Sequence, residues 1–148
     1  MQRALLALAL PGLLVACGEE GGGPAPVAMA GAEASIAEKR QAMVETLDTT
    51  ELATLLERGE VVLVDVRTPE EFGTGRLPGA LNAPVETFDT TSIPMEDGRE
   101  TILYCRSGNR SARAAEMLAE HTGGTVRHLE GGIVAWEDAG EEVIAPGT

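Results

Sequence analysis

Residues 101–118 read TILYCRSGNRSARAAEML, and this stretch decides the fold. It begins with an apolar run at 101–104 that is typical of a buried strand. Cys105 follows directly, and a short polar turn containing Gly108 leads to a segment, 111–121, that is expected to be helical. The stretch therefore predicts a strand, a tight loop and a helix in immediate succession.

A junction of this kind directs several backbone N–H groups towards one point. A sulfur atom at that point lies beside positive dipole ends, and Arg106 and Arg110 flank Cys105 as well. Such surroundings generally lower the pKa of a cysteine from about 8.5 to roughly 3.5–7.5. We therefore expect Cys105 to be an exposed thiolate at neutral pH, with room for an anionic substrate. The alternative is a buried structural cysteine, because free cysteine is among the most buried residue types.

The rest of the chain alternates between short apolar runs and helix-forming segments. Strands are expected at residues 44–47, 61–64, 80–82, 101–104 and 126–129, and helices at 36–43, 48–58, 69–72, 111–121 and 133–139. This alternation predicts an α/β fold, with a parallel sheet of about five strands and helices on both faces. Ligands of such sheets bind beyond the carboxyl ends of the strands, which is where Cys105 falls.

Charge and residue content exclude several classes of function. The formal net charge is −13, so a nucleic-acid partner or a polybasic membrane contact is not expected. Three of the basic residues, Arg106, Arg110 and Arg113, nevertheless cluster just after Cys105, which favours a local anion site. Neither His121 nor His128 has a second histidine or a cysteine at the spacing of a zinc site. We therefore expect no metal and no cofactor.

The first residues have the pattern of an export signal. The apolar run over 4–15 is shorter than the 18–20 or so residues of a membrane span, and it fits the apolar region of a signal peptide. Residues 14–17, LVAC, resemble the lipobox of bacterial lipoproteins, which implies cleavage before Cys17 and acylation of that residue. The alternative is an ordinary signal peptide with Cys17 incidental.

These patterns predict three parts of the chain. Residues 1–16 would be the signal peptide, 17–43 the lipidated N-terminus with a flexible tether rich in Gly, Ala and Pro, and 44–148 the folded domain. The expected location is the cell envelope, with the domain anchored to the membrane by the N-terminal lipid and facing the periplasm. The outer membrane is preferred, because Gly18 rather than aspartate follows Cys17.

Four segments carry a family resemblance, in order and with compatible spacing. They are 65–72 (DVRTPEEF), 75–82 (GRLPGALN), 104–111 (YCRSGNRS) and 129–136 (LEGGIVAW). Together they resemble the motifs of the rhodanese-like sulfurtransferases, with the third segment as the active loop. A histidine is common in that family where Arg76 stands. The resemblance spans the predicted folded domain and leaves out the signal and tether.

The resemblance implies a rhodanese-like domain and a persulfide mechanism at Cys105. The thiolate would take the outer sulfur of a donor such as thiosulfate and pass it to cyanide or a thiol. The expected substrate-binding residues are those of the loop, namely Arg106, Ser107, Gly108, Asn109 and Arg110. Their backbone amides would cradle the donor, and the two arginines would attract its oxygens. A protein acceptor is an alternative to a small molecule, and the domain is expected to be a monomer.

Other residues of the four segments are expected to support the site. Asp65 ends a buried strand and is expected to bind neighbouring loop N–H groups. Arg67 is expected to form a local ion pair with Glu71. Trp136 is expected to pack in the core, and the Gly131–Gly132 pair to adopt unusual backbone angles near the active loop.

Two further classes of function stay open. Some cysteine phosphatases share this fold, but their loop between Cys and Arg is longer, whereas only four residues separate Cys105 from Arg110. A shorter loop favours a smaller reacting group, a sulfur atom. Rhodanese-like folds also serve as non-catalytic binding modules or as sulfur carriers for a dedicated partner. The presence of Cys105 argues against a module.

Overall fold

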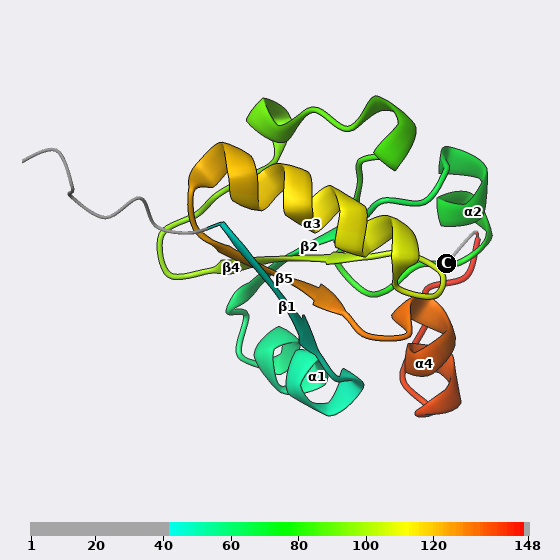
Figure 1. Ribbon diagram of the computed structural model, residues 1–148. Helices are drawn as coiled ribbons and strands as arrows, with labels where there is room; N and C mark the ends of the chain where they lie inside the picture. Colours follow the sequence, from blue (N-terminus) through cyan, green and yellow to red (C-terminus); the bar gives the residue numbers. More distant parts are fainter. Residues whose placement is uncertain (1–41, 147–148) are drawn as a thin grey trace, which may run out of the picture. The chain divides into compact units, whose positions relative to one another are not determined.

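The computed structural model describes residues 42–146. The predicted signal peptide, Cys17 and nearly all of the predicted tether lie outside these residues. Within them, one sheet contains five parallel strands in the order β1-β5-β4-β2-β3 (Figure 1). The strands are β1 (Met43–Leu47), β2 (Val61–Asp65), β3 (Leu81–Asn82), β4 (Glu100–Tyr104) and β5 (Thr125–Leu129). The predicted parallel α/β architecture is confirmed.

Four helices surround this sheet. They are α1 (Thr49–Glu57), α2 (Pro69–Thr74), α3 (Asn109–Thr122) and α4 (Gly132–Asp138), and two short 3-10 turns, η1 (Val85–Thr87) and η2 (Thr90–Ser92), follow β3. Figure 1 shows α3 across one face of the sheet and α1 and α4 on the other. The β4–α3 connection, α2 and α4 gather at the carboxyl ends of the strands. No helix among the described residues is long and apolar enough to cross a bilayer.

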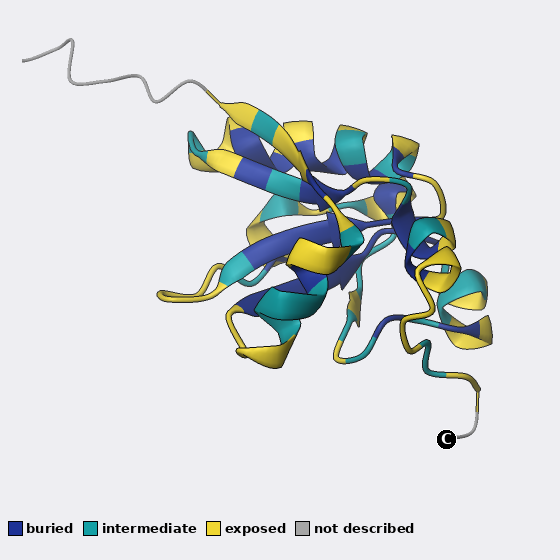
Figure 2. Cartoon of the chain, turned by 90° about the horizontal axis from the view of Figure 1, so that it is seen from below, coloured by how far each residue is buried: buried dark blue, intermediate teal, exposed yellow. Residues whose placement is uncertain are grey.

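The sheet separates two apolar layers, and alternate residues of the central strands enter one or the other. Val62, Val64 and Leu103 pack against α3, whereas Leu63 and Ile102 pack towards α1 and α4. All five residues of β2 are buried (Figure 2). The centre of the sheet is therefore covered on both faces, as the continuous β-branched run of β2 predicts.

Trp136 of α4 belongs to the second layer, where it is 2% exposed, and its indole N–H donates to the Glu142 carbonyl at 2.8 Å. The prediction that it packs in the core is confirmed. The fixed position of this ring holds α4 against the sheet, next to the end of β4.

Two element boundaries differ from those expected. Helix α3 begins at Asn109, two residues before the expected start, because Gly108 adopts φ +100° and turns the chain directly from the loop into the helix. Met43 belongs to β1, where it pairs with Thr125, so the helix predicted for 36–43 is wrong at this end. The remaining boundaries differ from the expected ones by a few residues at most.

Candidate active site

Cys105 is the first residue after β4 and lies inside the loop that joins this strand to α3. Its residue surface is 1% exposed, and its carbon atoms belong to the apolar layer beneath α3. The Gly108 N–H donates to the sulfur, with 3.1 Å between N and Sγ. The expectation that Cys105 is exposed is therefore wrong, because the loop folds over its own cysteine.

The buried sulfur nevertheless faces polar groups. Burial, the largest single influence, raises the pKa of Cys105, but hydrogen bonding outweighs it and the net pKa is lowered. The stabilising groups are the backbone and hydroxyl of Ser111 and the backbone N–H groups of Ser107 and Gly108. The side chain thus combines the burial of a structural cysteine with the lowered pKa of a reactive one.

The carbonyls of the same loop point away from the sulfur and bind α4. The N–H groups of Ile133 and Val134 donate to the carbonyls of Cys105 and Arg106, at 2.8 and 3.2 Å. Gly132 makes this approach with φ +59°, and a Cβ built there would lie 2.3 Å from the Cys105 carbonyl oxygen. The predicted unusual backbone at Gly131 and Gly132 is confirmed by their φ values of +70° and +59°.

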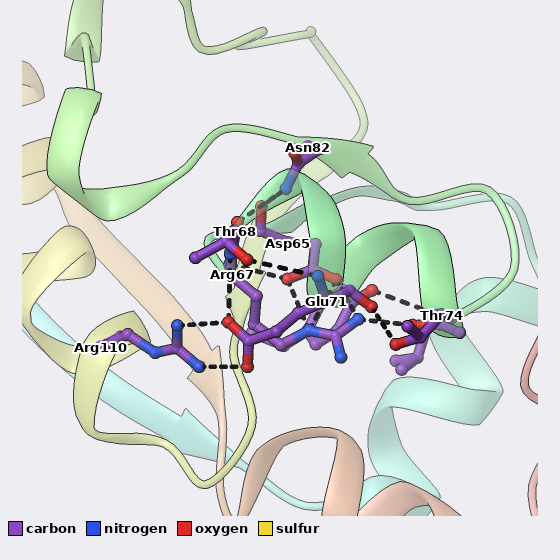
Figure 3. Close-up of polar contacts among 10 residues, drawn as sticks. Asp65, Arg67, Thr68, Glu71, Thr74, Asn82 and Arg110 are labelled. Atoms are coloured by element: carbon purple, nitrogen blue, oxygen red, sulfur yellow. Dashed lines mark hydrogen bonds and ion pairs between the residues drawn. The ribbon is translucent and has the colours of Figure 1, made fainter.

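Asp65, at the end of β2, organises the neighbouring loop (Figure 3). It is fully buried, and its Oδ1 accepts the Arg67 N–H at 2.9 Å, which confirms that it binds a loop N–H group. Its Oδ2 pairs with the Arg67 guanidinium at 2.6 Å, and the same guanidinium donates to the Gly75 carbonyl at 2.6 Å. This buried pair joins the end of β2 to the end of α2.

The predicted pair between Arg67 and Glu71 is wrong. Arg67 points inward to Asp65, whereas Glu71 lies in the first turn of α2, where it closes a capping box with Thr68. From there Glu71 reaches Arg110 in a bidentate pair, with N–O distances of 2.7 and 2.8 Å (Figure 3). The pair lowers the pKa of Glu71 to about 2, chiefly through this hydrogen bonding, and raises that of Arg110.

The five loop residues expected to bind substrate therefore fall into different settings. Gly108 is buried and contacts the sulfur, whereas Arg106, Ser107 and Asn109 are exposed. Arg110 is half-buried on the first turn of α3, and its charge is largely compensated by Glu71. Arg106 also lines a cleft of about 570 Å³, together with Arg67, Glu71, Val134, Glu137 and Val143. Cys105 is not among the residues that line this cleft.

Two residues of the site were missed in the sequence. Ser111 stabilises the Cys105 thiolate, and His128 on β5 lies beside Ser111. The sequence could have indicated Ser111, because a hydroxyl in the first turn of the helix after a cysteine loop can lie close to the sulfur. His128 gave none, because its proximity arises from the pairing of β5 with β4, where it lies opposite Leu103.

The fold and the site define a class of protein: a parallel α/β domain with an amide-lined cysteine loop at the carboxyl ends of its strands. The family model of the rhodanese-like domain matches residues 48–139, and the chain belongs to this family. The membership confirms the resemblance seen in the four sequence segments.

Known proteins with similar sequence or structure agree with this assignment. The chain is 37% identical over 105 residues to a sulfurtransferase of Allochromatium vinosum, covering 70% of this chain and 98% of that protein. It is also 37% identical to an uncharacterized protein of Synechocystis over 64% of this chain, which is 53% of that longer protein. The crystal structure of a rhodanese-like domain protein from Staphylococcus aureus superposes with a TM-score of 0.56 and 34% identity, covering 68% and 99% of the two chains. These matches support a sulfurtransferase type of function.

Proposed function

We propose that this chain transfers sulfane sulfur from thiosulfate or a related donor to a thiophilic acceptor, through a persulfide on Cys105. The observation that carries the proposal is the 3.1 Å contact between the Gly108 N–H and a buried sulfur whose pKa is lowered. Amide donors in a dry pocket stabilise negative charge without having to reorganise. They suit both the thiolate and the anionic persulfide that replaces it.

The chemistry takes two steps. The Cys105 thiolate attacks the outer sulfur of thiosulfate, a sulfur–sulfur bond forms, and the bond within the donor breaks so that its electron pair leaves with sulfite. A nucleophilic acceptor, cyanide or a thiolate, then attacks the terminal sulfur of the persulfide, and the electron pair of that bond returns to Cys105. This is covalent catalysis with ping-pong kinetics. Because Cys105 is 1% exposed, the donor presents a small terminal sulfur to the loop.

The test is the intact mass of the protein after incubation with thiosulfate. The full chain carrying Cys17→Ser should gain one sulfur atom and should lose it again when cyanide is added. The matched control, Cys17→Ser with Cys105→Ser, should gain nothing. An unchanged mass of the first variant, under conditions in which its fold is intact, would contradict the proposal.

The structure also bears on the phosphatase alternative. A phosphatase loop uses its arginine to hold a phosphate, whereas Arg110 is bound bidentately by Glu71 outside the loop. We therefore expect thiosulfate turnover to exceed the turnover of phosphate esters such as p-nitrophenyl phosphate. The opposite ranking would favour a phosphatase. If Cys105→Ser left the biological role intact while the domain turned over neither substrate, a binding module would be favoured.

We also propose that Cys17 carries lipid and anchors the domain to a membrane of the cell envelope, facing the periplasm. The proposal rests on the lipobox-like residues 14–17 and the Gly, Ala and Pro content of the segment that follows. Analysis of the mature N-terminus is the test. A modified Cys17 at the first position supports the proposal, and a mature N-terminus elsewhere overturns it.

A further inference from the structure

The two-step chemistry assigns no bond-making or bond-breaking step to two buried polar side chains behind the active loop. Ser111 is fully buried in the first turn of α3, and His128 on β5 is 7% exposed. Ser111 Oγ lies 3.1 Å from His128 Nδ1 and 3.0 Å from the Gly108 carbonyl oxygen. Burial of two hydrogen-bonding side chains is costly unless they are well paired. The Ser111–His128 contact supplies that pairing, and we ask what it does for the loop.

The Ser111 hydroxyl has one proton, so it can donate only one hydrogen bond at a time. Here it can donate to the Gly108 carbonyl or to the ionised sulfur of Cys105. When it turns to the sulfur, its lone pairs remain to accept a hydrogen bond. The group at hydrogen-bonding distance is His128 Nδ1. A neutral imidazole that carries its proton on Nδ1 supplies the missing donor and fixes the orientation of the hydroxyl.

The surroundings of His128 keep the imidazole neutral. In the sheet it lies between Thr46 of β1 and Leu103 of β4, neither of which is charged. The charged groups that act on it are Glu116, from α3, and Glu130, just after β5, and both favour the protonated ring. Burial is the larger influence and lowers the pKa of His128. At neutral pH the ring therefore carries one N–H, and in the tautomer with this proton on Nδ1 it donates to Ser111 Oγ.

We propose that His128 is a positioning residue, which acts through the Ser111 hydroxyl to direct a hydrogen bond to the ionised sulfur of Cys105. The inference rests on the proposed function for its purpose, since a thiolate held in this way is the nucleophile of the first step. Its geometry does not depend on the identity of the donor or acceptor. It predicts that His128 and Ser111 act as one unit.

The test measures the rate at which iodoacetamide alkylates Cys105 as a function of pH, in the full chain carrying Cys17→Ser. Loss of a hydrogen bond to a charged group corresponds to about a tenfold change. We therefore expect Ser111→Ala and His128→Leu each to lower the alkylation rate at neutral pH by about tenfold and to move the midpoint of the pH profile upward. Adding His128→Leu to Ser111→Ala should change nothing further.

Conservative variants distinguish positioning from packing. His128→Asn places an amide near the position of Nδ1 and should retain the profile of the parent protein. His128→Gln places its amide further out, near the position of Nε2, and should behave like His128→Leu. If circular dichroism shows that His128→Leu does not fold, the comparison of His128→Asn with His128→Gln still tests the proposal.

Additive effects of His128→Leu and Ser111→Ala, or equal profiles for His128→Asn and His128→Gln, would overturn the proposal. Alkylation requires no sulfur donor, so this failure is distinct from failure of the proposed function. A protein that forms no persulfide could still show the predicted coupling, and one that forms it could lack the coupling.

Discussion

The two sides of the loop around Cys105 show opposite polarity. On the inner side, N–H groups stabilise the sulfur, and the Gly108 amide lies 3.1 Å from it. On the outer side, the carbonyls of Cys105 and Arg106 point away and accept hydrogen bonds from Ile133 and Val134 of α4. The inner side contacts the reacting atom, whereas the carbonyls of the outer side bind α4.

One planar peptide links the two sides, because the Arg106 carbonyl, which accepts from Val134, and the Ser107 N–H, which stabilises the sulfur, belong to the same peptide group and point in opposite directions. The Cys105 carbonyl belongs to a buried residue and accepts from the buried Ile133, so it would be costly to leave unpaired. Helix α4 therefore fixes the peptide orientation on which the sulfur depends. Residues outside the loop can therefore influence the charge of the sulfur.

The largest effect is expected from a substitution on the outer side. In Gly132→Ala the new Cβ would meet the Cys105 carbonyl at 2.3 Å, in a backbone conformation with φ +59°. We expect the free energy of unfolding to fall by about 2–3 kcal/mol, since overpacking and backbone strain both contribute. The alkylation rate of Cys105 should fall as well, because the loop is displaced. Chemical denaturation and the pH profile of alkylation measure the two effects.

Gly98→Ala is the matched control for this prediction. Gly98 has φ +82°, and a Cβ built there would meet nothing within 4 Å. This variant carries the conformational penalty without the clash and should leave the alkylation rate unchanged. Equal losses of stability in the two variants would show that the contact of α4 with the loop carries no weight.

A smaller effect is expected at the Glu71–Arg110 ion pair, which joins α2 to α3. Both side chains of the Glu71–Arg110 pair are about one-third exposed (33% and 30%), so we expect Glu71→Gln to cost only about 0.5–1 kcal/mol at neutral pH. The pKa of Glu71 is lowered from 4.5 to about 2. Its stabilising contribution is therefore present above about pH 4.5 and is lost as the pH falls towards 2.

Acid denaturation of the two proteins provides the measurement. The difference in stability between the parent protein and Glu71→Gln should shrink as the pH falls from 4.5 towards 2 and should vanish below that value. A difference that persists below pH 2 would show that the variant acts through the geometry of α2 rather than through charge.

The sequence predicted the sheet and its helices well, because the central strands β2 and β4 contain continuous apolar runs and the helices α1 and α2 begin with capping side chains. It also placed Cys105 correctly, since the loop is local in the chain. The ion-pair partners of the arginines were harder to predict. Arg67 pairs with the buried Asp65, and Arg110 pairs with Glu71 because α2 and α3 bring them together. The Arg67–Glu71 prediction relied only on their closeness in the sequence. His128 depends on strand pairing, which local sequence does not reveal.

The central claim is that a cysteine sealed in the core is ionised by the loop around it. Its most direct test is a titration of the ultraviolet thiolate absorbance of the Cys17→Ser chain, with the Cys17→Ser, Cys105→Ser chain subtracted. The account predicts a midpoint below the value of about 8.5 for free cysteine. A thiol that stays protonated well above that value would contradict it.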